Sequence, residues 1–439
     1  MQRTVRYPPL FLFCLALFAG QAAAQPAPRC VAPTGGDDTA LLQGALERCS
    51  RATSSCRVDL CAGVFQTGIL RVNDFRGTLR GAGPLATILR ALPDLPVNAA
   101  SAGFFRDDPF DPGTNPWPYL LQFVDGRATI RDLGIRIPDP PDPSRPTSGW
   151  FLLEGFGPYF ELRGAMLFTG RNQVEFDVHR VRVEAEPDAQ SEVATTALGG
   201  VEFAGLLFDP RGLEPFPVIP AQGTFRMADS EVVGVGGGSE ISELDQASVV
   251  LARNRYRSAV AVDVIDLHRS EIAVQSNQWQ VSYRGVQVIQ NLDGAPSEDT
   301  DFLVQGNQGT LAPFLSGAGD GISFQDPVDA SPVPGGSVLR ASGNLLQAGG
   351  GVGPAATGIS ARGAGELRLV NNTLTGGARV GLDVDVTEGC VVRANSLGGL
   401  ANGNEPDLRL GPATQGCVAR VAPSDVVQDQ GTGNLVIRR

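Results

Sequence analysis

The second half of the chain repeats a short pattern of alternating apolar and polar residues that ends on an asparagine. In each copy the Asn is followed by one or two further residues and another apolar residue. The copies centre on Asn254, Asn277, Asn307, Asn344, Asn372 and Asn395, and a degenerate copy surrounds Asp229. Alternation with a period of two predicts half-buried strands. A constant short unit at variable spacing predicts stacked coils with loop insertions.

A second short strand, usually led by Gly, follows most of these units. The segments are 285–288, 321–324, 358–360 and 381–386. Because no helical crossover separates them, parallel stacking of the coils satisfies the backbone groups and buries one continuous core. We expect each Asn to take a left-handed turn conformation and to bond the next coil through its amide, as a structural ladder rather than a ligand site.

The N-terminal part predicts a short amphipathic helix followed by strands. Asp37 and Asp38 precede an i, i+3/i+4 pattern of apolar residues, where acidic groups favour a helix start; the pattern consists of Leu41, Leu42, Ala45, Leu46 and Cys49. Short strands are expected at 58–60, 64–65, 69–72 and 79–83. Such a helix can cover the open end of a solenoid core.

Three N-terminal segments resemble the opening of the pectate-lyase-like superfamily: GGDDTALLQGALERC, VDLCAGVFQTGILRV and GTLRGAGPLATILR. Residues 407–410 through 430–434 resemble the closing coils of such proteins. The resemblance implies an all-β fold, a right-handed parallel β-helix with a short N-terminal capping helix. It also implies a polysaccharide laid along a groove on one face of the solenoid. Many functions share this scaffold, so the resemblance speaks for the fold more than for the chemistry.

Residues 1–24 have the features of a secretory signal peptide. Arg3 and Arg6 form a basic start, an apolar stretch runs over 10–18, and alanines at 22–24 provide a cleavage site. We expect export to the periplasm or the extracellular space and one β-helix domain over 25–439. Within that domain, Pro-rich and aromatic insertions are expected near 93–119, 138–160 and 187–220. No stretch is long and apolar enough to predict a transmembrane helix.

The composition narrows the partners. All 35 basic residues are Arg, and the formal net charge is -12, which argues against nucleic acid as a partner.

Six cysteines remain after the signal, an even number that fits disulfides in an oxidising compartment. They are Cys30, Cys49, Cys56, Cys61, Cys390 and Cys417. Local pairing would join Cys390 to Cys417 and form two bridges among the first four, whose connectivity the spacing leaves open. A metal site at the first four is disfavoured, because no C-x-x-C pair or nearby His is present.

Alternation within the Gly-led strands places one set of polar side chains on the outer face. We expect Arg284 and Asp320 to be neighbours on stacked strands and, with Asp263 from the preceding coil, to be the catalytic candidates. The substrate-binding candidates are Tyr283, Gln287, Asp383 and Asp385. The plain alternative is that all of these are ordinary solvated side chains on a strand face.

These residue types fit two reactions. Glycoside hydrolysis needs one protonated and one ionised carboxyl group, which Asp320 with Asp263, Asp326 or Asp383 could supply. A polyuronate lyase needs a base and a cation, the latter supplied by Arg284. No bound cofactor is required, although Asp383 and Asp385 could hold Ca²⁺. Of the two His residues, His268 is the better candidate for a general base.

The active-site motifs of known relatives are absent. The chain lacks the Asn-Thr-Asp and Gly-His-Gly motifs of polygalacturonases, the Asp-Pro-His motif of alginate epimerases and the Trp-Ile-Asp-His segment of pectate lyases. Two hypotheses therefore stand: a carbohydrate-active lyase or hydrolase, and a non-catalytic β-helix with a surface-binding or envelope-structural role.

Overall fold

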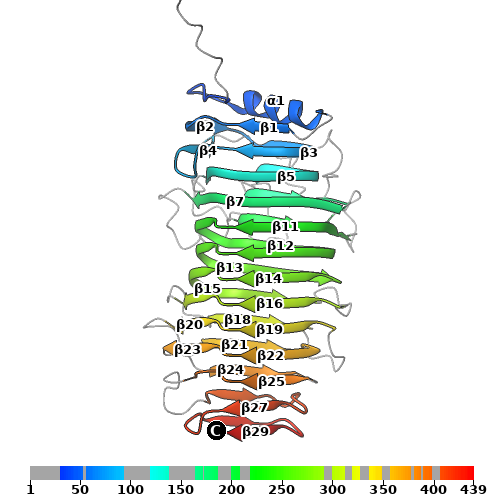
Figure 1. Cartoon of the computed structure of the whole chain (residues 1–439), viewed down its shortest axis with the longest axis vertical. Coiled ribbons are helices and arrows are strands. Elements are labelled where there is room, and N and C mark those ends of the chain that lie inside the picture. The colour runs from blue at the N-terminus through cyan, green and yellow to red at the C-terminus, as the bar shows by residue number, and fades with distance from the viewer. Residues whose placement is uncertain are drawn as a thin grey trace, which may run out of the picture.

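The computed structural model shows a parallel β-helix, an elongated stack of coils that begins under one helix (Figure 1). It describes residues 30–52, 56–92, 119–137, 164–171, 173–185, 199–207, 218–290, 299–311, 319–326, 336–348, 356–376, 380–386, 389–397 and 406–439. The expected all-β fold with a short N-terminal helix is confirmed by the strand pairings. The signal peptide, the insertion near 138–160 and all of the insertion near 93–119 except Tyr119 lie outside the described residues. Of the insertion near 187–220, residues 199–207 and 218–220 are described and include β8, β9 and β10.

The elements follow one another as a helix and 29 strands. The N-terminal ones are α1 (Thr39–Ser50), β1 (Cys56–Asp59), β2 (Gly63–Thr67), β3 (Leu70–Arg80), β4 (Thr87–Ala91), β5 (Tyr119–Ile137), β6 (Gly164–Thr169), β7 (Gln173–Ala185), β8 (Gly199–Ala204), β9 (Leu206–Leu207) and β10 (Val218–Ile219). The central ones are β11 (Ala221–Ala228), β12 (Glu231–Ala252), β13 (Arg255–His268), β14 (Glu271–Gln275), β15 (Gln278–Ile289), β16 (Asp301–Gln305), β17 (Gln308–Leu311) and β18 (Asp320–Gln325). The C-terminal ones are β19 (Val338–Ser342), β20 (Leu345–Ala348), β21 (Thr357–Arg362), β22 (Glu366–Val370), β23 (Thr373–Gly376), β24 (Val380–Asp385), β25 (Cys390–Arg393), β26 (Leu408–Leu410), β27 (Val418–Val421), β28 (Val427–Asp429) and β29 (Leu435–Arg438).

Parallel pairing joins the described strands other than β9 and β10 into three stacks, one on each face of the coil, whereas β9 and β10 pair antiparallel as a separate sheet. One stack runs from β1 through β14 and β16 to β29, and a second from β2 through β17 to β23. The third contains β6, β8, the middle of β12, β13 and β15, and then β18, β21, β24, β26 and β28. We call it the Gly-led stack, because it contains the expected Gly-led segments.

A continuous apolar core fills the coils, and α1 covers its first end. Phenylalanines stack from coil to coil; the Phe123 and Phe168 rings lie 5.6 Å apart and the Phe203 and Phe225 rings 5.3 Å apart. On α1, Leu42 and Leu46 are buried as expected, whereas Leu41 is on the exposed side. Burial of this helix face removes apolar surface that an open coil end would leave in water.

The asparagine ladder is confirmed, but the left-handed residue is not the Asn itself. Each Asn side-chain oxygen accepts from the N–H of the preceding ladder Asn, and its Nδ2 donates to a strand carbonyl, as in Asn307 to Val274 O at 2.9 Å. Positive φ values fall instead on the residue before each Asn: Arg253, Ser276, Gly306, Gly343, Asn371 and Ala394. The Asn is left in a conformation that aims its amide along the stack.

The degenerate copy shows the same division of roles. Asp229 holds the left-handed position with φ of 53°, and Ser230 takes the ladder position, where its N–H donates to Asn254 Oδ1 at 3.0 Å.

Several strands are longer than the sequence pattern predicted. The expected strands at 69–72 and 79–83 merge, apart from their outermost residues, into β3, and β12 runs over 22 residues through two corners. Left-handed residues inside the strands, such as Asp74 in β3 and Glu243 in β12, turn the chain while pairing with the neighbouring coils continues. The alternation rule misses these bends because it treats each corner as a strand end.

Glycine in the Gly-led stack is required by close contact between coils. A Cβ at Gly321 would lie 2.6 Å from the Gly358 carbonyl oxygen, and one at Gly358 would lie 2.6 Å from the Gly381 carbonyl oxygen. Such distances are too short for a methyl group beside backbone. These glycines therefore let successive coils approach closely along the face that carries the candidate site.

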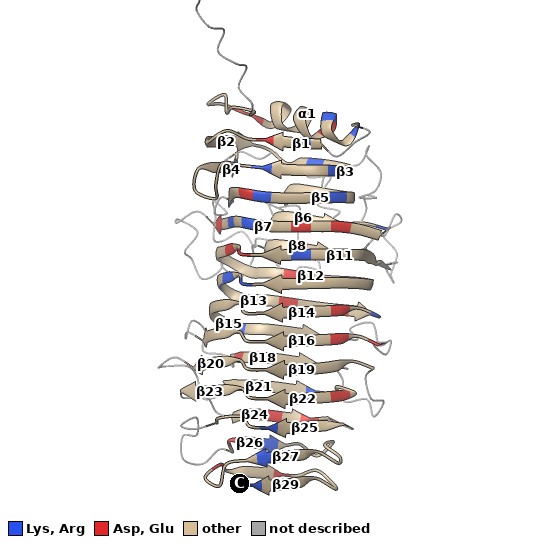
Figure 2. Ribbon diagram, viewed as in Figure 1, with Lys and Arg blue, Asp and Glu red and all other residues tan. Residues whose placement is uncertain are grey.

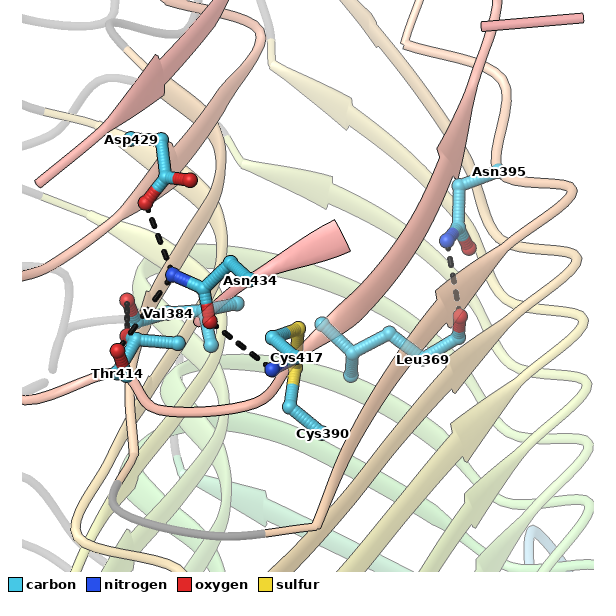
Figure 3. Close-up of a disulfide and its surroundings, with 8 residues drawn as sticks. All are labelled: Leu369, Val384, Cys390, Asn395, Thr414, Cys417, Asp429 and Asn434. Carbon is cyan, nitrogen blue, oxygen red and sulfur yellow. Dashed lines mark hydrogen bonds between the residues drawn. A yellow bond between two sulfur atoms is a disulfide. The ribbon is translucent and has the colours of Figure 1, made fainter. Parts of the chain in front are cut away.

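All six predicted cysteines form disulfides. Cys30 bonds to Cys61, Cys49 to Cys56, and Cys390 to Cys417. Figure 3 shows the last bridge between the Asn395–Leu369 and Asn434–Cys417 hydrogen bonds. Cys390 is the register partner of the buried Leu367, so this bridge continues a row of core positions. No helix in the described part of the chain is both long and apolar enough to cross a membrane.

Asn372→Ala tests the ladder against its exposed neighbour Asn371. Asn372 Nδ2 donates to Ala341 O and Asn395 Oδ1, and its oxygen accepts two bonds from Asn344. Because buried partners lose their bonds, we expect a loss of about 2–4 kcal/mol in unfolding free energy. Asn371→Gly, at a left-handed and exposed position, should lose less than about 0.5 kcal/mol. Urea unfolding followed by circular dichroism measures both, and equal losses would contradict the ladder's role.

Replacing Cys390 and Cys417 together by Ala should loosen the C-terminal coils first. The bridge closes a separation of 27 residues, so its removal should lower the unfolding free energy by about 2–4 kcal/mol. Limited proteolysis with mass spectrometry should then find new cuts after residue 389. Cuts confined to the N-terminal coils would contradict this expectation.

Candidate functional site

The Gly-led stack aligns one row of polar side chains across successive coils. From strand to strand the register pairs Glu202, Glu240, Asp263, Gln287, Ser323, Ser360 and Asp383. Each follows the leading Gly, or Ala261 in β13, by two positions. Parallel strands are spaced about 4.8 Å apart, so the first three residues, which we call the carboxylate row, bring three acidic groups onto adjacent coils.

Arg284 lies beside this row, and the structure brings Asp320 next to it, as the stacking argument predicted. The two residues are register partners, and Arg284 Nε lies 3.8 Å from Asp320 Oδ2. Arg284 Nη1 also donates to Gln287 Oε1 at 2.6 Å, and the guanidinium carbon lies 4.5 Å from the centre of the Tyr283 ring. Arg284, Gln287, Tyr283 and Asp320 therefore form one connected group next to Asp263.

The side chains of this face are more enclosed than a solvated strand face would be. Gln287, Ser323, Ser360 and Asp383 are buried, and the Arg284 and Asp320 side chains are only 17% and 13% exposed. Treating them as ordinary solvated residues is therefore wrong. Mutual contacts account for part of the burial, since Ser323 and Thr357 both donate to the Asp320 carboxylate. Glu240, Asp263 and Tyr283 remain half-buried and keep some contact with solvent.

Crowding of acidic groups raises the pKa values in the carboxylate row. Burial and the neighbouring Glu240 raise the pKa of Asp263 to about 7, against a smaller opposing effect of Arg284. Burial, followed by the charge of Glu240, also raises the pKa of Glu202 well above its ordinary range. The pKa of Asp320 is raised by burial, although Arg284 opposes the change. Glu240 thus lies between two carboxyl groups that it helps to keep protonated.

Two atoms of the group are buried without any hydrogen-bond partner: Asp263 Oδ1 and Arg284 Nε. An unmade hydrogen bond on a buried polar atom is costly. The two atoms are one acceptor and one donor, and both belong to residues that are half-buried as a whole. A ligand with hydroxyl groups can offer both a donor and an acceptor to such a pair.

Sequence reasoning missed Glu202, Glu240 and Tyr119. The Tyr119 hydroxyl donates to the Glu202 carboxyl from 83 residues away, a contact that no local pattern reveals. The two glutamates had a readable signal, however. Gly200-Val201-Glu202-Phe203 and Gly238-Ser239-Glu240-Ile241 repeat the alternation of Gly285-Val286-Gln287-Val288. Extending the Gly-led pattern toward the N-terminus would have found them.

Asp383 and Asp385 lie apart from the carboxylate row. Asp383 is three coils beyond Gln287 and pairs with Arg409 through both carboxylate oxygens, with Arg362 3.7 Å away. Asp385 accepts from the Ala413 N–H at 2.8 Å. Within the described ranges no group of three or more His, Cys, Asp or Glu residues could hold a metal ion. Asp383 is thus engaged by Arg409 and Asp385 by a backbone amide, and Ca²⁺ binding at this pair stays a prediction.

The His residues are outside the group as well. His179 contacts Asp229 at 2.9 Å on another stack, beside the bidentate Arg253–Asp229 pair. His268 is the register partner of Asp245 beyond the Gly-led segment of β13.

Comparison with known proteins yields structural neighbours only. No family model and no curated protein matches the chain. The A-module of mannuronan C-5 epimerase AlgE4 from Azotobacter vinelandii is 13% identical, with 91% of this chain and 93% of that chain covered and a TM-score of 0.45. Polygalacturonase from Erwinia carotovora ssp. carotovora is 12% identical, with 93% and 94% covered and a TM-score of 0.31. The Agl-KA catalytic domain is 12% identical, with 95% and 69% covered and a TM-score of 0.38.

The pairings in this chain give the parallel β-helix that the pectate-lyase-like resemblance implied. The chemistry of the site has to be argued from its own residues, since the neighbours' identities speak for the fold alone.

Asp263→Asn should remove a pH dependence of stability. With the folded pKa at about 7 and the unfolded value near 4, the folded state alone holds this proton between those pH values. The stabilisation is therefore complete below about pH 4 and is lost as pH rises to about 7. We expect Asp263→Asn to match wild type at pH 4 and to exceed it by about 2–4 kcal/mol at pH 8.

Urea unfolding at both pH values provides the measurement. Glu271→Gln, an exposed carboxylate on β14, is the matched control and should leave the pH dependence unchanged. A wild-type-like pH profile in Asp263→Asn would contradict the raised pKa.

Proposed function

We propose that this protein is a carbohydrate-active enzyme that hydrolyses glycosidic bonds of a polysaccharide lying along the Gly-led stack. The observation that carries the proposal is the position of Glu240 between two carboxyl groups, Glu202 and Asp263, whose pKa values it raises. Glycoside hydrolysis needs one protonated and one ionised carboxyl group at the same bond. In such sites the surroundings of two neighbouring acids set their pKa values apart, so that one donates a proton and the other stays ionised.

Asp263 is assigned as the general acid. Its carboxyl group holds a proton up to a pH of about 7 and is half-buried, so a leaving oxygen can reach it. A general acid is most effective when its pKa is close to the working pH. In the reaction, this proton passes to the glycosidic oxygen as the bond to the anomeric carbon breaks.

Glu240 is assigned as the ionised partner that meets the developing positive charge at the anomeric carbon. Adjacent strands place Glu240 and Asp263 about 4.8 Å apart along the stack. Retaining glycosidases have their two carboxyl groups separated by about 5 Å. We therefore expect a covalent intermediate on Glu240 and products that retain the anomeric configuration.

Arg284, Asp320, Gln287 and Tyr283 are assigned to positioning and binding. Arg284 is held by Gln287, Tyr283 and Asp320, and its charge opposes the rise in the pKa of Asp263. These contacts hold the Arg284 guanidinium next to Asp263, where its charge limits the rise in the pKa of Asp263. Tyr283 adds a half-buried aromatic surface of the kind that sugar rings contact.

The disulfides support export as the setting for this activity. The six cysteines outside the signal segment all pair within the described coils, and such bridges persist in the periplasm or outside the cell. We propose that the signal peptide at 1–24 directs the chain there, where polysaccharides occur.

The test is a polysaccharide panel with purified mature protein, following reducing ends and ultraviolet absorbance of unsaturated products together. We expect reducing ends without unsaturated absorbance, and Glu240→Gln and Asp263→Asn should each lower kcat by about 10²–10⁴-fold. Glu271→Gln serves as the folded control at wild-type activity. Formation of unsaturated products would show a lyase reaction and would contradict hydrolysis. Absence of any product from folded protein would favour the non-catalytic binding or structural role.

A further inference from the structure

Beyond the carboxylate row, the polar track continues without charge for three coils. Gln287, Ser323 and Ser360 follow one another in register on β15, β18 and β21. The next member, Asp383, is already neutralised by Arg409. The three uncharged side chains are buried, and Gln287 and Ser323 form hydrogen bonds with Arg284 and Asp320, respectively. A glycan lying over this track would therefore meet no further charge from these residues beneath it.

The only cation whose charge acts on Asp263 and Asp320 in the described part of the chain is Arg284. Its Nη1 donates to Gln287 Oε1, its guanidinium lies over the Tyr283 ring, and its charge faces the Asp320 carboxylate. Around the carboxylate row the described face thus offers acidic groups and one cation, Arg284, which its neighbours already hold. The other cations of this stack, Arg362 on β21 and Arg409 on β26, lie beside Asp383, three coils beyond Gln287 (Figure 2).

An anionic sugar would be unfavourable on such a face. Each uronate carboxylate would enter a partly desolvated site beside Glu240 and Asp320, and a charge taken out of water needs a counter-charge of its own. Uncharged hydroxyl groups and ammonium groups carry no such penalty. Their N–H and O–H groups can also satisfy Asp263 Oδ1, the buried acceptor without a partner.

We infer that the substrate of this site is a glycan without anionic groups, built from neutral or amino sugars, and that polyuronates are excluded. The inference rests on the proposed function, since it concerns the same carboxylate row. The shared chemistry of neutral and amino sugars is donation of hydrogen bonds to carboxylates without added negative charge. Glu240 and Asp263, the half-buried members of the carboxylate row, then determine this selection by charge.

Calorimetric binding of three 1,4-linked tetrasaccharides tests the inference, using glucose, glucosamine and glucuronic acid units that differ only in their substituents. We expect the glucose or the glucosamine oligomer to bind at least tenfold more tightly than the glucuronic acid oligomer. The order of the first two separates a neutral from an amino-sugar substrate. Equal or tighter binding of the glucuronic acid oligomer would overturn the inference.

Glu240→Gln and a change of salt concentration test whether charge repulsion causes the weaker binding of the glucuronic acid oligomer. Removal of one negative charge should strengthen binding of the glucuronic acid oligomer on the order of tenfold, whereas Glu271→Gln should leave it unchanged. Raising the salt concentration should narrow the gap between the oligomers in wild type, because salt screens repulsion. A gap that neither change affects would contradict the electrostatic argument.

Measuring which polymers are cleaved distinguishes failure of this inference from failure of the proposed function. If none of the tetrasaccharides binds, the polymer that the enzyme cleaves decides: an uncharged or amino polymer supports the inference and a polyanion overturns it. Cleavage of a polyuronate would thus leave the hydrolase proposal standing and remove only the substrate class. Neither cleavage nor binding of any glycan would remove both.

Discussion

The parallel register between successive coils is the constraint on which the rest of this structure depends. Strand hydrogen bonds, the buried asparagine ladder and the close glycine contacts all hold each coil directly over the one before. Because register is kept, a residue two positions after each leading Gly falls in one row along the face. The candidate site is a consequence of that alignment: acidic side chains far apart in sequence are stacked about one strand spacing apart.

The same alignment creates the chemistry. Burial and the neighbouring charge of Glu240 raise the pKa values of Asp263 and Glu202, so carboxyl groups on adjacent coils favour the protonated form there. The engaged Arg284 moderates this rise at Asp263 without supplying a spare positive charge. The proton donation and the selection against anionic sugars that we propose therefore have one physical origin, the excess of carboxylates around the carboxylate row.

Local patterns predicted most of the fold and part of the site. Alternation with Asn and Gly at fixed places identified the coils, and register then brought Arg284 to Asp320 as expected. The position of the left-handed turn was missed, because the amide's bonding and the backbone bend belong to neighbouring residues, for example Asn254 and Arg253. Burial of Gln287 and Ser323 and the contact between Tyr119 and Glu202 depend on distant segments, so alternation alone could not predict them.

The proposed catalysis depends most directly on whether Asp263 holds its proton near neutral pH. Infrared difference spectroscopy can observe this proton. Subtracting the Asp263→Asn spectrum from that of wild type over a pH series isolates the protonated carboxyl band of this residue. We expect the band to persist to about pH 7 and, in a Glu240→Gln background, to disappear at lower pH, because the charge of Glu240 helps to raise this pKa. A band lost near pH 4 in wild type would contradict the central claim.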